Sequence, residues 1–186
     1  MRSICVFCGT KTGGEPRYEA LAQAAGGAIA RAGMRLVYGG ATAGLMGVTA
    51  RAALSQGGEV FGVIPEFLIP VEGRQDGVEI RITATMAARK AMMVEEADAF
   101  LILPGGAGTL EEVFDMVMLA QLGRHAKPAA FLDTAFWGPL ETLMRHVVET
   151  GFADPKILEA MSFHAGVEDA LSALDAAMNR RETDTG

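Results

Sequence analysis

The segment LPGGAGTLEE, running from Leu103 to Glu112, gathers three glycines, a hydroxyl and two carboxylates in one short stretch. Glycines leave backbone N–H groups open to a ligand, and a helix that begins directly after them adds unpaired N–H groups and about half a positive charge. We therefore expect this segment to cradle a phosphate group. The expected contacts are Gly105, Gly106, Gly108 and the hydroxyl of Thr109.

The segment departs from the common loops that bind larger nucleotides. It has no lysine of a G-x-x-x-x-G-K-[ST] loop, and its glycines do not fit G-x-G-x-x-G. A monophosphate is therefore favoured over ATP or a nicotinamide dinucleotide.

Glu112 has two interpretations from the residues alone. Thr109 and Glu112 match the capping box T-x-x-E, which would make Glu112 a device for starting a helix. A carboxylate beside a bound phosphate would be repelled unless it faced another part of the ligand. A sugar with its hydroxyls is the part that fits, and this favours a role for Glu112 in binding or catalysis.

Two further glycine-rich segments follow expected strands. One is YGGATAGLMG, Tyr38 to Gly47, which contains Gly40 and Gly44, and the other is the short Cys8–Gly9–Thr10. The first is explained almost as well by a tight turn as by ligand contact, and the second is too short to be specific by itself. Because the carboxyl ends of parallel strands meet at one edge of a sheet, we expect these loops to lie beside the LPGGAGTLEE loop.

Arg89 and Lys90 are adjacent cations in MAARKAMM, a segment otherwise made of apolar and small residues. Basic residues on a helix are commonly solvated, and Lys90 could pair with Glu95 or Glu96. Near a helix start, both would also be placed to meet an anionic ligand or a carboxylate. Four methionines are expected on or near the helices beside this site: Met92, Met93, Met116 and Met118. We favour a role in core packing for them, and a subunit interface or a base pocket is the alternative.

No metal site is expected. Cys5 and Cys8 have C-x-x-C spacing but no second pair of ligands, so we interpret them as buried residues of a first strand. The three histidines lie far apart in the sequence. We expect neither a metal nor a cofactor.

Short apolar runs alternate with longer amphipathic segments, which is typical of a parallel sheet covered by helices. Expected strands are Ser3–Phe7, Arg35–Tyr38, Glu59–Ile64, Glu79–Ile82, Ala99–Leu103 and Ala129–Leu132. Expected helices are Pro16–Ala32, Leu45–Gln56, Met86–Ala97, Leu110–Leu122, Trp137–Thr150 and Val167–Asn179. The predicted fold is α/β, a Rossmann-like three-layer arrangement with helices on both faces. We expect residues 1–180 to form a single nucleotide-binding domain and 181–186 a polar tail.

The 186-residue chain is half hydrophobic and carries a net charge of −7, with its 16 basic residues scattered. This argues against a nucleic acid or a membrane surface as partner. The apolar run near the N-terminus is too short for a signal peptide, and no window approaches the ~20 apolar residues of a membrane span. We expect a cytoplasmic protein.

Taken together, the segments resemble the Lonely-guy (LOG) family of cytokinin-activating phosphoribohydrolases, whose members are often labelled lysine decarboxylases. The resemblance runs from about Ser3 to the last helix. Its markers are ICVFCGT, LVYGGATAGLMG, GVIP, RKAMM, PGGAGTLEE and AQLGRHAKP. The separation between R-K and P-G-G-x-G-T-x-x-E makes the combination specific.

The resemblance implies that the P-G-G-x-G-T loop holds a 5′-phosphate and that Arg89 and Glu112 are the catalytic pair. We add Lys90, Glu111, Gly40, Gly44, Thr10 and Glu72 as expected substrate contacts. The resemblance also implies a homodimer with its site near the subunit interface. This chain has Ala87 where the family commonly has histidine, Ala41 where a third glycine is common, and Thr10 where serine is usual.

The implied reaction cleaves the bond between base and ribose in a nucleoside 5′-monophosphate, either AMP or a cytokinin riboside monophosphate. Positive charge builds on the anomeric carbon, where a carboxylate stabilises it or activates water, and we assign this role to Glu112. Arg89 would assist the departing base. Lysine decarboxylation would need pyridoxal phosphate on a Schiff-base lysine, and no lysine is identified for it. The alternative function is a non-catalytic nucleotide or cofactor carrier, which would not need the acid–base pair.

Overall fold

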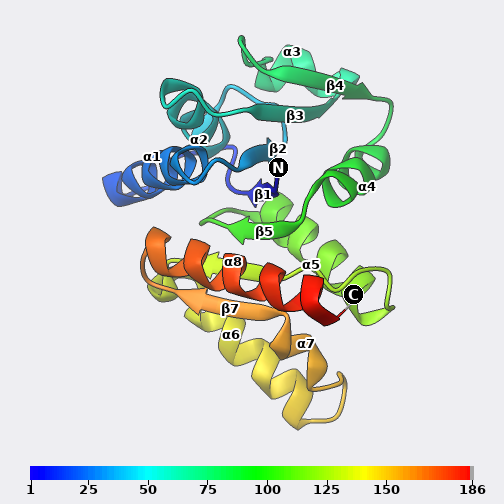
Figure 1. The fold of residues 1–186 in the computed structure, drawn as a ribbon. Helices are drawn as coiled ribbons and strands as arrows, with labels where there is room; N and C mark the ends of the chain where they lie inside the picture. The colour runs from blue at the N-terminus through cyan, green and yellow to red at the C-terminus, as the bar shows by residue number, and fades with distance from the viewer. Residues whose placement is uncertain (185–186) are drawn as a thin grey trace.

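A single seven-stranded sheet forms the centre of the molecule in the computed structural model, which describes residues 1–184 (Figure 1). The strands are β1 (Ser3–Phe7), β2 (Arg35–Tyr38), β3 (Val60–Pro65), β4 (Glu79–Thr83), β5 (Ala99–Ile102), β6 (Ala129–Leu132) and β7 (Met161–His164). Their order is β4-β3-β2-β1-β5-β6-β7, and all neighbours pair in parallel. The predicted parallel sheet is confirmed.

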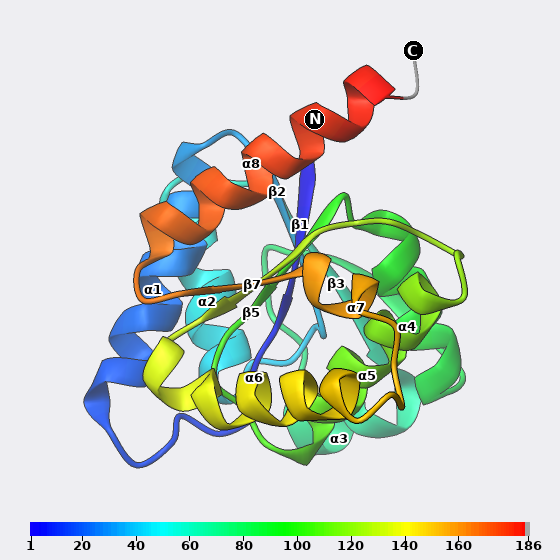
Figure 2. The same cartoon turned by 90° about the horizontal axis from the view of Figure 1, so that it is seen from below.

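Helices cover both faces of this sheet, as expected (Figure 2). Helices α1, α2 and α8 pack on one face, and α4, α5, α6 and α7 pack on the other. The helices are α1 (Pro16–Arg31), α2 (Gly44–Ser55), α3 (Ile69–Glu72), α4 (Met86–Glu96), α5 (Ala107–Gln121), α6 (Thr134–Glu149), α7 (Lys156–Glu159) and α8 (Val167–Asp184). A short 3₁₀ turn, η1 (Glu66–Leu68), precedes α3.

Two hydrophobic cores result, one on each side of the sheet. In β1, Ile4 and Val6 face α1, α2 and α8, whereas Cys5 and Phe7 face the helices of the other side. Every residue of β1 is buried, because both faces of the strand are covered. This is why the central strand β1 is a continuous run of small or apolar residues rather than an alternating one, with Cys5 as a buried free thiol.

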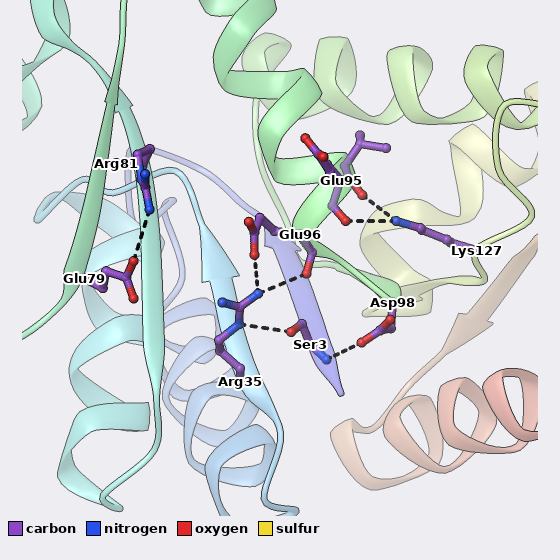
Figure 3. Close-up of polar contacts among 9 residues, drawn as sticks. Ser3, Arg35, Glu79, Arg81, Glu95, Glu96, Asp98 and Lys127 are labelled. Atoms are coloured by element: carbon purple, nitrogen blue, oxygen red, sulfur yellow. Dashed lines mark hydrogen bonds and ion pairs between the residues drawn. The ribbon is translucent and has the colours of Figure 1, made fainter. Parts of the chain in front are cut away.

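Polar contacts tie together the edge of the sheet where the strands begin (Figure 3). Arg35 of β2 pairs with Glu96 at the end of α4 and donates to the Ser3 hydroxyl at 3.0 Å. The backbone N–H of Ser3 donates to Asp98 at 2.7 Å. Lys127 donates to the Val94 carbonyl at 2.7 Å, which satisfies a carbonyl at the last turn of α4. The opposite edge, where the strands end, carries the glycine-rich loops.

All six expected strands and all six expected helices are present, with ends shifted by up to a few residues. Strand β7 was not predicted, because the four residues MSFH combine polar and apolar side chains without a clear pattern. Helix α8 continues to Asp184, so residues 181–184 of the expected polar tail extend this helix, and residues 185–186 lie outside the described residues. Among the described residues, no helix is long and apolar enough to cross a bilayer.

Candidate active site

The carboxyl ends of β1 and β5 lie side by side, at the point where the strand order reverses direction. In open α/β sheets this is where ligands bind. The loops are joined by a hydrogen bond from the Gly9 N–H to the Pro104 carbonyl at 3.1 Å, and the Leu45 N–H donates to the Gly9 carbonyl at 3.0 Å. A cavity of about 720 Å³ opens here, lined by residues from all three glycine-rich segments. The prediction that these segments share one edge is confirmed.

The first turn of α5 forms one wall of the cavity. Helix α5 begins at Ala107 after Gly106, with no side-chain cap, so the predicted capping box of Thr109 and Glu112 does not form. Thr109 instead lies inside the first turn. A Cβ added to Gly105 would lie 2.1 Å from the hydroxyl oxygen of Thr109. Nothing lies within 4 Å of a Cβ built on Gly106 or Gly108. The N–H groups of this turn, which have no partner within the helix, are therefore open to a ligand.

Arg89 enters the cavity from α4 and is only 4% exposed. The helix is capped at its start by Thr85, whose hydroxyl accepts from the Ala88 N–H at 3.1 Å. The Arg89 Nη2 donates to the Gly39 carbonyl at 3.2 Å and lies 3.9 Å from an oxygen of Glu112. Its Nε is buried without a hydrogen-bond partner. An unpaired buried donor is costly, so this N–H is available to a bound ligand.

Glu112 faces Arg89 from the second turn of α5, with a side chain 11% exposed. Burial raises the pKa of Glu112 to about 7, while the charge of Arg89 acts to lower it. Glu111 and Glu72 also act to raise this pKa. A carboxyl group that titrates near neutrality in a cavity suits acid–base chemistry.

Glu72 lines the same cavity from α3. One of its carboxylate oxygens is buried without a partner. Its backbone carbonyl accepts two hydrogen bonds from Thr42, from the N–H at 3.1 Å and from the hydroxyl at 3.0 Å. A carboxylate can only accept hydrogen bonds, so the free oxygen of Glu72 is suited to a ligand hydroxyl.

The other residues predicted to contact the substrate divide into those that line the cavity and those that do not. Thr10 lines the cavity, whereas Gly40, Gly44, Lys90 and Glu111 do not. Gly40 and Gly44 have φ angles of +78° and +55°, and a Cβ on Gly44 would lie 2.2 Å from the Thr10 backbone. These two glycines shape the loops rather than line the cavity.

Lys90 forms ion pairs with Glu111 and Asp115, two acidic residues of α5. The predicted partners Glu95 and Glu96 belong to its own helix, and Glu96 pairs with Arg35 instead. Lys90 thus joins α4 to α5 beside the cavity. Ala87, at the position of the family histidine, is exposed and does not line the cavity.

Several residues of the cavity were not predicted from the sequence. Four of them are apolar: Met46, Phe67, Leu68 and Met86. Met46 and Met86 each place a sulfur 3.9 Å from the Arg89 guanidinium. Of the methionines considered beforehand, Met93 and Met116 are buried in the core and Met118 is exposed. Lys11, in the loop after β1, also lines the cavity, and no motif had marked it.

Comparisons with known proteins show the family of this chain. The family model described as "Possible lysine decarboxylase" matches residues 46–174. A cytokinin riboside 5′-monophosphate phosphoribohydrolase from Rhodococcoides fascians is 42% identical over 176 residues, which cover 93% of this chain and 89% of that protein. A protein of the same name from Arabidopsis thaliana is 41% identical over 83% of this chain and 72% of its own length. The chain belongs to the Lonely-guy family.

Solved structures resemble this Lonely-guy protein in fold at lower identity. A molybdenum cofactor binding protein from Rippkaea orientalis has a TM-score of 0.73 at 20% identity, with 95% of this chain and 97% of that chain covered. The molybdenum cofactor carrier protein from Chlamydomonas reinhardtii has a TM-score of 0.70 at 24% identity, covering 94% and 96%. At these identities the likeness shows the Rossmann-like fold alone.

In the described part of this Lonely-guy chain, no three His, Cys, Asp or Glu residues are grouped to hold a metal.

Proposed function

We propose that the protein hydrolyses the N-glycosidic bond of a nucleoside 5′-monophosphate, AMP or a cytokinin riboside monophosphate, to the free base and ribose 5-phosphate. One observation carries the proposal. The buried Arg89 and the titratable Glu112, 3.9 Å apart, share one cavity with the open first turn of α5. A phosphate at that turn leaves the sugar and the base to extend toward the pair.

In this reaction the bond between the anomeric carbon and the base nitrogen breaks, and the base leaves with the bonding electrons. The ionised carboxylate of Glu112 stabilises the positive charge that develops on the sugar. The same carboxylate takes a proton from the attacking water, whose oxygen bonds to the anomeric carbon. Arg89 donates a hydrogen bond toward the departing base, and the proton that Glu112 takes from the water passes to the base, which leaves in its neutral form.

The remaining cavity residues fit the rest of such a substrate. The free oxygen of Glu72 would accept from a ribose hydroxyl. The apolar part of the lining would take the base and an N6 substituent. It comprises Met46 and Met86, which lie beside Arg89, with Phe67 and Leu68. Apolar walls with a few polar groups are typical of sites for small organic ligands.

The two competing functions have less support. Lysine decarboxylation would need a desolvated lysine placed to hold pyridoxal phosphate. Lys90 is engaged by two carboxylates outside the cavity lining, and Lys11, which does line the cavity, is exposed. A carrier function is suggested only by proteins that share the fold at 24% identity or less. A carrier has no use for a buried Arg89–Glu112 pair.

We also propose that the protein acts as a homodimer through α5. Phe114, Met118 and Leu122 are 40, 49 and 67% exposed and follow one another at four-residue spacing. Such a stripe along one helix face is suited to pairing with its symmetry-related copy.

The compartment proposed for the protein is the cytoplasm. The unbridged Cys5 and Cys8 agree with a reducing compartment of this kind.

The test is to incubate the purified protein separately with AMP and with isopentenyladenosine monophosphate and to separate the products by chromatography. Free base and ribose 5-phosphate are expected from at least one nucleotide, and Glu112→Gln should abolish their release. Intact nucleotide in both reactions, with binding still detectable, would reject hydrolysis in favour of a carrier. Full activity in the Glu112→Gln variant would reject the assigned role of Glu112.

A further inference from the structure

Lys11 lies in a loop whose backbone is held at three points. At its start, the Gly9 N–H is bonded to the Pro104 carbonyl at 3.1 Å. On its inner side, Gly44 packs so closely that a Cβ there would lie 2.6 Å from the backbone nitrogen of Lys11. At its outer end, a Cβ on Gly13 would lie 2.6 Å from the Tyr18 ring. The loop therefore presents the Lys11 side chain from a fixed position at the cavity.

The charges that line the cavity are nearly balanced before a ligand binds. Among the described residues, the lining contains two carboxylates, Glu72 and Glu112, and two cations, Lys11 and Arg89. Arg89 is buried, bonded to the Gly39 carbonyl and turned toward Glu112. Lys11 is exposed, and no ion pair is found for it among the described residues.

A phosphate dianion entering this cavity would meet both carboxylates. The open turn of α5 offsets only part of that repulsion, because the helix contributes about half a charge. A lysine without a competing carboxylate supplies a full positive charge. Lys11 belongs to the same wall as Gly9 and Gly105, whose loops are in contact.

We propose that Lys11 is a ligand of the substrate 5′-phosphate and selects phosphorylated nucleotides over nucleosides. This inference rests on the proposed function and adds a residue that no motif of the family marks. The contact is made equally in the ground state and in the transition state, since the phosphate does not react. Loss of Lys11 should therefore raise KM and leave kcat unchanged.

Calorimetric titration with ribose 5-phosphate tests the contact without requiring turnover. Lys11→Gln should weaken this binding about tenfold at low salt, and Lys11→Arg should retain most of it. The difference between wild type and Lys11→Gln should shrink as salt rises, because the side chain is exposed. Adenosine, which lacks the phosphate, should bind both proteins equally. Lys156→Ala, which removes an exposed lysine on α7, is the matched control and should change nothing.

The outcomes separate the two proposals. Equal ribose 5-phosphate affinity in wild type and Lys11→Gln, with hydrolysis intact, would overturn the role of Lys11 and leave the proposed function standing. A fall in kcat with unchanged KM would also overturn it. If the wild type neither bound ribose 5-phosphate nor hydrolysed either nucleotide, the proposed function would fail and the role of Lys11 with it.

Discussion

The guanidinium of Arg89 occupies the space that a side chain on Gly39 would need. A Cβ built on Gly39 would lie 1.8 Å from the Arg89 Nη2 and 2.8 Å from the Met46 sulfur. The missing side chain therefore allows the arginine to reach the Gly39 carbonyl and to face Glu112. This glycine at the end of β2 positions Arg89, the cation of the proposed catalytic pair.

Gly39→Ala should fold but lose activity. The clash falls on the end of a flexible side chain, so Arg89 can move away, but it then leaves Glu112. Displacing a catalytic group by about 1 Å costs on the order of 100-fold in rate, and we expect kcat to fall by that factor. Steady-state kinetics with AMP or the isopentenyl nucleotide measures it.

Gly27→Ala is the control for this prediction. A Cβ on Gly27 in α1 would also meet an arginine, lying 3.0 Å from the Arg31 Nη1. The Arg31 side chain is 57% exposed and can move into solvent, so activity should be unchanged. The helix should gain about 0.5–1 kcal/mol from the replaced glycine. Equal activity in Gly39→Ala and wild type would contradict the positioning role of Gly39.

The pH dependence of catalysis should report Glu112. The proposed mechanism requires the ionised form of Glu112, and burial raises the pKa of Glu112 to about 7 in the free protein. We expect kcat/KM to rise about tenfold per pH unit below that value and to level off above it. Binding of ribose 5-phosphate, measured over the same pH range, separates the titration of the substrate phosphate from that of Glu112. A kcat/KM that stays flat between pH 5 and 8 would exclude Glu112 as the titrating group.

The same pKa has a consequence for stability. Because the folded protein holds the Glu112 proton more tightly than the unfolded chain does, this residue's contribution to stability is lost as pH rises through about 7. Glu112→Gln should therefore increase the free energy of unfolding at pH 8 by roughly 1–3 kcal/mol and have little effect at pH 4. Denaturant unfolding at both values measures this.

Glu149→Gln, at an exposed position on α6 away from the cavity, is the control for the stability measurement. It should leave the free energy of unfolding unchanged at both pH values. A Glu112→Gln variant less stable than wild type at pH 8 would show that burial does not make the ionised Glu112 carboxylate destabilising.

Met118→Glu should prevent the proposed dimer. The exposed side chain lies in the middle of the Phe114–Leu122 stripe, and a pair of charges facing each other across a two-fold axis would repel. Sedimentation velocity should give a dimer for wild type and a monomer for the variant. Leu143→Glu, at a 52% exposed position on α6, should remain dimeric. A monomeric wild type at micromolar concentration would reject the dimer.

Those parts of the fold that depend on local pattern could be predicted from the sequence. The apolar runs of β1, β2 and β6 mark strands directly, and the glycines of LPGGAGTLEE mark a loop at the end of a strand. The start of α5 was misplaced, because T-x-x-E matches a capping box whether or not the helix begins there. Ala107 begins the helix instead, and Thr109 packs against Gly105.

Contacts between distant segments could not be predicted. The partners of Lys90 were sought on its own helix, but Glu111 and Asp115 come from α5, which only the tertiary packing brings close. Lys11 and Phe67 lie in loops or short turns without periodicity, so nothing in the sequence indicated that they face the cavity. The resemblance identified Arg89 and Glu112, but not the glycine that makes room for Arg89.

The hydrogen bonds from Thr42 to the Glu72 backbone carbonyl affect more of the cavity than the Glu72 carboxylate alone. Glu72 shares a segment of seven residues, η1 and α3, with Phe67 and Leu68, and none of the seven is fully buried. Two hydrogen bonds from Thr42 fasten its end. In the proposed complex this segment offers Glu72 to the sugar and Phe67 and Leu68 to the base, so a change at Thr42 should alter recognition of both parts of the nucleotide together.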